Sequence, residues 1–187
     1  MKFKIGDVAV EPTLGICKIE GVKIMKVDGK EDIFYVFKAG NASVLIPKTQ
    51  LEKSGIRKPM DEEDIKKIIT LLRSPVTPIR QDARAQYISY REIMKSGDPT
   101  KIAKLLRNLF ILEQTDDLKG KEREIMESAR RFLVDEITFV KQAPKAKVTE
   151  RLNSALKAMY KKKITKDRDK AKKDKDKKKK DKPVQEI

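Results

Sequence analysis

The sequence predicts an α+β protein of two domains, a small N-terminal SH3-like or Tudor-like barrel of five strands and a compact all-α domain behind it. Apolar residues recur with a period of about two before Pro59 and with a period of about 3.6 after it. The last 27 residues are mainly Lys and Asp, so they have almost nothing to bury and are expected to be disordered. We therefore expect domains at residues 1–57 and 61–160 and a tail at 161–187.

The expected strands are short and apolar, and turn residues separate them. Asp28 and Gly29 lie between two of them, and this dipeptide favours a two-residue hairpin turn because both central residues need a positive φ. Pro47 ends the last strand because proline has no N–H to donate to a ladder. The five predicted strands are Phe3 to Ile5, Val8 to Val10, Ile16 to Met25, Ile33 to Phe37 and Ser43 to Ile46.

Five amphipathic helices are expected in the second domain. Asp61 is a plausible N-cap for the first, and Gly97, Asp98 and Pro99 end one helix and begin the next. The first two predicted helices cover residues 61–73 and about 79–95, and the third begins at Pro99 and carries the apolar residues from Ile102 to Phe110. The fourth follows the polar turn at Gly120 and runs to about residue 141, and the fifth covers about residues 145–161. Their apolar stripes can pack against each other as a compact helical domain.

The composition argues against an enzyme and against a bound metal or cofactor. The chain has no histidine, its single cysteine is Cys17, and none of its eight glycines lies in a phosphate-binding loop motif. Cys17 is expected to be a small buried hydrophobe, which fits a reducing cytoplasm. The N-terminus does not resemble a signal peptide, and no apolar run is long enough to span a membrane.

The charge indicates a polyanionic partner. The net charge is +16, and residues 161–187 contribute +8 of it, from 14 Lys or Arg and 6 Asp or Glu. In the second predicted helix, Arg80, Arg84 and Arg91 are interleaved with two tyrosines, a pattern that suits phosphate and base contacts. The alternative is a solvated arginine face with the tyrosines in the core. The same choice applies to Arg123 and Arg130, which share a helix face.

The order of these parts resembles the CarD/CdnL family of RNA polymerase-binding transcription regulators. The resemblance covers about residues 1 to 142 and excludes the tail. It rests on many spaced matches, which are the Met1 to Asp7 start, Glu11-Pro12, Gly15, Asp28-Gly29, Ile46-Pro47, Gly55-Ile56-Arg57 and Ser96-Gly97-Asp98.

The resemblance implies that the N-terminal domain, which the family shares with transcription-repair coupling factor, docks on the polymerase β subunit by pairing strand edges. By position, the contacts fall on Met25 and Lys26 and on the stretch Val44, Leu45, Ile46 and Pro47. Met25 and Leu45 stand where some relatives have arginines. The interface is therefore expected to be more apolar here.

The resemblance also implies that the helical domain contacts promoter DNA at the upstream edge of the transcription bubble. There the family inserts a tryptophan wedge, but this chain has no tryptophan and has Ala83 at that position. We expect Arg84 or Tyr87 to replace the wedge, or charge alone to hold the DNA. Arg123 matches a basic position of the family that faces DNA.

The favoured hypothesis is a monomeric cytoplasmic adaptor that binds polymerase and tunes the stability of open promoter complexes without chemistry of its own. Two alternatives remain. One is a sequence-independent nucleic-acid-binding protein that acts through its basic helical face and tail. The other is a protein-interaction module whose tail only aids solubility.

Overall fold

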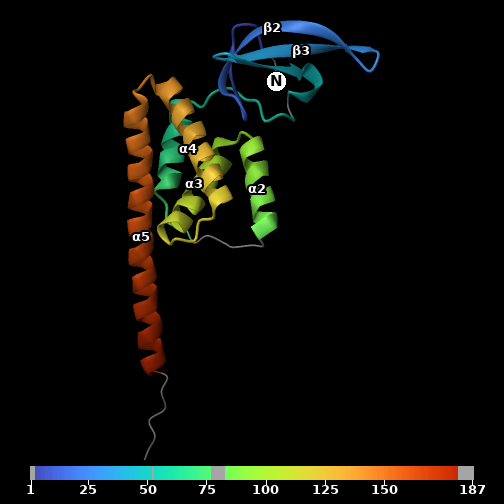
Figure 1. The fold of residues 1–187 in the computed structure, drawn as a ribbon. Helices are drawn as coiled ribbons and strands as arrows, with labels where there is room; N and C mark the ends of the chain where they lie inside the picture. Colours follow the sequence, from blue (N-terminus) through green and yellow to red (C-terminus); the bar gives the residue numbers. More distant parts are fainter. Residues whose placement is uncertain (1–2, 52, 77–82, 181–187) are drawn as a thin grey trace, which may run out of the picture.

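The computed structural model describes residues 3–51, 53–76 and 83–180. A curled antiparallel sheet lies at one end of a helical bundle, in agreement with the predicted α+β class (Figure 1). The sheet order is β1-β2-β3-β4, and the short 3-10 helix η1 (Lys48–Gln50) follows it. The strands are β1 (Val8–Glu11), β2 (Gly15–Val27), β3 (Lys30–Ala39) and β4 (Ala42–Pro47).

The sheet has four strands where the sequence analysis predicted a barrel of five. The expected strand from Phe3 to Ile5 is wrong, because the Lys4 N–H bonds the Asp7 carboxylate (2.8 Å) and closes a local turn instead. Phe3 is nonetheless buried and packs edge-on against Phe37. The alternating pattern over three residues therefore indicated burial correctly for Phe3 but not for Ile5, which is 64% exposed, and it did not indicate a turn.

The hairpin between β2 and β3 has the predicted two-residue turn. Asp28 and Gly29 have φ values of 50° and 77°, as a type I′ turn requires. Beneath the sheet lies a small core of buried residues from the strands and the segment after β4. Its members are Phe3, Ala9, Cys17, Ile19, Phe37, Ile46, Leu51 and Ile56.

Cys17 is a buried free cysteine, as its place in a predicted strand suggested. Its thiol donates to the Ala9 carbonyl oxygen at 3.3 Å. Burial, with a smaller contribution from the Glu11 carboxylate, raises the pKa of the thiol to about 11. The thiol therefore stays protonated in the folded protein at neutral pH.

Five helices of the described residues form the bundle, and two of them, α1 and α3, begin at the caps read from the sequence. The side chain of Asp61 accepts from the Asp64 N–H, and that of Asp98 accepts from two N–H groups, with Pro99 following as the first helical residue. The predicted start of the second helix at Ile79 lies outside the described residues. The helices are α1 (Glu62–Leu72), α2 (Ala83–Lys95), α3 (Pro99–Gln114), α4 (Gly120–Lys141) and α5 (Lys145–Lys180).

Helix α5 is longer than predicted. It continues to Lys180, past residue 161, where the disordered tail was expected to begin. Composition alone predicted disorder, but extending an existing helix needs no new nucleation and lysine is a good helix former. An ion pair of 2.5 Å between Lys163 and Asp167, one turn apart, adds local support. Residues 181–187 lie outside the described residues.

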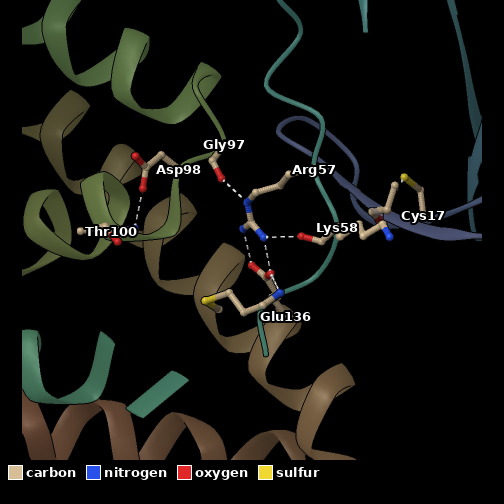
Figure 2. A network of polar contacts seen from close by, with 9 residues as sticks. Cys17, Arg57, Lys58, Gly97, Asp98, Thr100 and Glu136 are labelled. Atoms are coloured by element: carbon tan, nitrogen blue, oxygen red, sulfur yellow. Dashed lines mark hydrogen bonds and ion pairs between the residues drawn. The ribbon is translucent and has the colours of Figure 1, made fainter. Parts of the chain in front are cut away.

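Arg57 connects the sheet, the linker and the bundle at one point (Figure 2). Its backbone pairs with Val10 of β1, while its guanidinium makes two hydrogen bonds of 2.6 Å to the Glu136 carboxylate on α4. The same guanidinium donates to the Gly97 carbonyl oxygen at 2.7 Å. Glu136 is only 1% exposed and also accepts from the Met60 N–H at 2.8 Å.

Two glycines allow the linker to approach the turn between α2 and α3. Gly55 and Gly97 have φ values of 70° and 63°. A Cβ on Gly97 would lie 2.6 Å from the Gly55 carbonyl oxygen, and one on Gly55 would lie 2.7 Å from two carbonyl oxygens of the turn. The sequence motifs around these glycines thus form the junction that sets the sheet against the bundle.

Candidate functional site

Strand β4 forms an edge of the sheet. It pairs with β3 along one side, and in the described part of the chain no strand pairs with its other side. The opposite edge, β1, is partly covered because Val10 exchanges two backbone hydrogen bonds with Arg57. The free edge is therefore β4, where the sequence analysis placed four candidate contact residues.

The structure divides those four residues between the two faces of the sheet. Ile46 is buried in the sheet core and Val44 packs against that core. Because successive side chains of a strand alternate, Leu45 and Pro47 lie on the outer face. Leu45 is 41% exposed and Pro47 is half-buried.

Met25 and Lys26 lie on β2 near the hairpin tip, away from the β4 edge, and both are exposed. The register pairs Met25 with Asp32 and Leu45 with Val36. Asp32 and Val36 are four residues apart on β3, so Met25 and Leu45 share the outer face, ~13 Å apart along the strands and about 10 Å apart across the sheet. Lys26 lies on the other face.

Phe34 occupies the outer face between these two side chains and was not among the predicted contacts. It is 9% exposed yet belongs to neither hydrophobic core of the described residues. Its cross-strand neighbours are Lys23 and Pro47. The sequence held a signal for it, since the uninterrupted apolar run of β3 predicts that both faces are covered.

The hairpin also exposes apolar side chains on the side of the sheet that carries the core. Val22, Ile24 and Ile33 lie beyond that core and are exposed. Apolar residues are thus accessible on both faces of the hairpin, as expected of a surface that contacts another protein.

Helix α2 carries a second candidate surface. Arg84 and Arg91 are exposed on it, whereas Tyr87 is half-buried against the bundle, with Lys121 Nζ 5.7 Å from its ring centroid. Tyr90 is buried and its hydroxyl contacts Gln86, which favours the core interpretation for this tyrosine. Arg80 and the side chain of Ala83 lie outside what the structure describes.

Arg123 and Arg130 share a face of α4, and it is a different face from the one that meets α2. Arg123 contacts Glu113 of α3 at 3.4 Å, and Arg130 donates to Asn153 of α5 at 2.7 Å. Lys121, which covers Tyr87, is two residues from Arg123 and so about 200° around the helix. The structure therefore does not gather the predicted DNA contacts into one patch.

The two arginines also differ in accessibility. The side chain of Arg123 is 59% exposed, and its contact with Glu113 is an exposed ion pair of low cost to break. That of Arg130 is 19% exposed and joins α4 to α5. Arg123 is thus the better candidate for an external contact.

A cavity of about 310 Å³ separates α2 and α4 from the β1–β2 turn. Arg91 and Tyr87 of α2, Pro12 of the turn and Ser128 of α4 line it. The α2 surface therefore continues toward the sheet domain.

The described residues of these surfaces include no metal-binding cluster. Among residues 3–51, 53–76 and 83–180, no group of three or more His, Cys, Asp and Glu side chains is placed to hold a metal ion. Within the same residues, no helix has the length and apolar character needed to cross a bilayer. The arrangement offers binding surfaces: a free strand edge with apolar neighbours and an arginine-bearing helix.

Comparison with known families matches two adjoining domain models to the chain. The CarD-like/TRCF RID domain matches residues 3–60, and the CarD C-terminal domain matches residues 67–153. The chain is also 24% identical over 141 residues to the "Putative transcription factor YdeB" of Bacillus subtilis (strain 168), covering 74% of this chain and 92% of that protein. Residues from Lys161 onward lie outside both domain matches.

Proposed function

Because this chain belongs to the CarD family of transcription regulators, we propose that it binds the β subunit of RNA polymerase through its sheet domain and contacts promoter DNA through its helical domain. The DNA site is the upstream edge of the transcription bubble. Holding the melted promoter more tightly than the closed one stabilises the open complex without chemistry. The protein acts as a monomer in the cytoplasm.

The free edge of β4 is the observation that carries the polymerase half of this proposal. An exposed edge presents unpaired backbone N–H and C=O groups, to which a strand of a partner can add. Leu45 supplies an apolar contact beside that edge, and Met25 supplies another on the same outer face, near the hairpin tip. Specificity then comes from these side chains and affinity from the main chain.

Two proline variants of the full chain test the edge. Successive N–H groups of an antiparallel strand point in opposite directions, so one of Val44 and Leu45 donates toward β3 and the other toward the free side. Val44→Pro and Leu45→Pro therefore form a matched pair, in which thermal unfolding identifies the variant that keeps the sheet stable.

The variant that remains stably folded should lose binding to purified polymerase, while Leu45→Ala, which keeps the N–H, should retain most of it. Full binding by the stably folded proline variant would show that β4 is not the polymerase-binding edge.

The DNA half of the proposal rests on the exposed arginines. Arg84 lies on α2 beside the position of the family's wedge, and Arg123 lies on the α3–α5 side of α4. We expect Arg84→Ala and Arg123→Ala each to shorten the lifetime of open promoter complexes without affecting polymerase binding. A charge-assisted phosphate contact contributes roughly 1 to 3 kcal/mol, so each loss should be about fivefold or more.

Arg130→Gln serves as the control for these variants, because its side chain already bonds Asn153. We expect it to change thermal stability more than complex lifetime. Since Arg84 and Arg123 lie on different faces, an effect of only one would identify the face that meets DNA. No effect of either would contradict the proposed DNA contact.

A further inference from the structure

The C-terminal part of α5 leaves the bundle as a single helix. Leu152, Leu156 and Met159 are fully buried, and the Tyr160 hydroxyl donates to the Gln114 carbonyl oxygen at 3.5 Å. Beyond Tyr160 the helix continues past the ends of the other helices (Figure 1). From Lys166 to Asp169 every side chain is exposed.

This extension, residues 161–180, is the most strongly charged part of the protein. It has 13 Lys or Arg and 4 Asp, and therefore carries +9 of the total net charge of +16. Like charges along one helix repel each other, and a polyanion relieves that repulsion while it releases its own counterions. Among residues 161–169, whose side chains the structure describes, none is buried in a core that would account for the charge.

We propose that the extension is a second, sequence-independent DNA-binding element that contacts the phosphates of duplex DNA. The inference rests on the proposed function in taking DNA as the partner, and it adds a site outside both matched domains. Twenty helical residues span ~30 Å, which is close to one turn of duplex DNA at about 34 Å.

The chemistry of the extension favours duplex over single-stranded nucleic acid. Proteins that bind unpaired strands stack bases on aromatic side chains, and residues 161–187 include no aromatic residue. Lysines and one arginine interact with phosphates whatever the base sequence. Duplex phosphates in regular rows match an array of this kind.

The position of the extension also agrees with a duplex at the helical domain. The contact of Tyr160 with Gln114 places its start at the end of α3, and Arg123 of α4 contacts the neighbouring Glu113. Asp116 and Asp117 lie in the turn that follows α3. Attraction of DNA to this end of the bundle therefore comes mainly from the extension.

The charge gives an expected magnitude. If about half of the net charge faces one duplex, ~4 phosphates are neutralised, and each contributes about −0.9 to the slope of log K against log salt. Raising the salt from about 50 to 200 mM then weakens the contribution of the extension by roughly 150-fold.

The test is fluorescence anisotropy on a 30-base-pair duplex of arbitrary sequence, with the full chain and a chain that ends at Tyr160. We expect the shortened chain to bind more weakly at low salt, to have a salt slope smaller by about 3 to 4, and to unfold at nearly the same temperature. Equal slopes and affinities would overturn the proposal.

A matched pair of triple variants separates a local effect from net charge. Lys161, Lys162 and Lys166 are changed to Gln in the extension, and Lys18, Lys23 and Lys30 are changed to Gln in the sheet domain; all six are exposed. Only the extension variant should lose DNA affinity substantially. Equal losses would show a bulk charge effect and overturn the assignment to this segment.

Competition with a single-stranded RNA and with an acidic polypeptide of equal charge identifies the ligand class. Duplex DNA should compete best, and stronger competition by either alternative would replace DNA as the partner.

Polymerase binding is measured separately with the same proteins. A shortened chain that still binds polymerase but shows unchanged DNA affinity refutes only the extension. Failure of the full, unaltered chain to bind polymerase refutes the proposed function.

Discussion

Replacing Glu136 with glutamine tests whether the junction holds the two domains together. The change keeps the shape of the side chain but removes the charge that accepts both hydrogen bonds from Arg57. A single amide oxygen must then accept hydrogen bonds from both Arg57 and the Met60 N–H. The new NH₂ group faces N–H donors, from which it cannot accept a hydrogen bond. The guanidinium is left beside a neutral partner in a half-buried site.

The structure sets the expected magnitude. Removing one partner of a buried ion pair costs about 3 to 5 kcal/mol. The side chain of Arg57 is 19% exposed and keeps its bonds to the carbonyl oxygens of Lys58 and Gly97, which places the loss near the lower end. We therefore expect Glu136→Gln to lower the free energy of unfolding by about 3 kcal/mol, or the melting temperature by roughly 6 to 12 °C.

A double-mutant cycle measured by thermal and urea unfolding isolates the pair. Arg57→Met should be similarly destabilising because it leaves the Glu136 carboxylate buried without its guanidinium, but the double variant should lose about 2 kcal/mol less than the sum. Asp135→Asn is the control, since that residue forms an exposed ion pair with Lys145 and should cost less than about 1 kcal/mol. Additive losses, or a Glu136→Gln effect no larger than that of the control, would refute the reasoning.

Three further predictions concern single residues. Gly97→Ala should destabilise the protein by at least about 2 kcal/mol in urea unfolding, because its φ is positive and the added Cβ meets the Gly55 carbonyl oxygen, whereas Gly120→Ala, with open space around it, should be nearly neutral. Cys17 should react with a thiol reagent only on unfolding. The pKa of its thiol is about 11 in the folded state and near 8.5 in the unfolded state. The free energy of unfolding should therefore fall as the pH rises between these values, and Cys17→Ala should remove this dependence. Ala83→Trp should lengthen open-complex lifetime if α2 lies at the bubble edge, and no gain would argue against that placement.

Local chemistry determined the parts of the fold that the sequence predicted correctly. The Asp28-Gly29 turn and the caps at Asp61 and Asp98 depend on a few adjacent residues, so their signals are complete within a short window. The strand at Phe3 was wrong because alternation over three residues does not distinguish a ladder from a turn. The predicted end of α5 at about residue 161 was wrong because amino-acid composition does not show that a helix already packed in the bundle can extend without a new nucleation step.

The sites were harder to predict, because they depend on which faces meet. Spacing placed Arg123 and Arg130 on one face, but only the bundle shows that Arg130 is bonded to α5. The buried ion pair of Glu136 was not predicted, although the sequence contains a pattern that indicates it. Glu136 falls on the apolar stripe of α4, between Phe132 and Val140, and a lone carboxylate there indicates a buried partner. Its partner Arg57 is 79 residues away, beyond any pattern of spacing.

The most direct test of the proposed adaptor is a pull-down of purified RNA polymerase, treated with nuclease so that DNA cannot bridge the proteins. The bait is the chain that ends at Tyr160, with and without residues 1–57, and helical content is checked in both. We expect polymerase to be retained, through its β subunit, only when residues 1–57 are present. Equal retention by both proteins, or none by either, would contradict it.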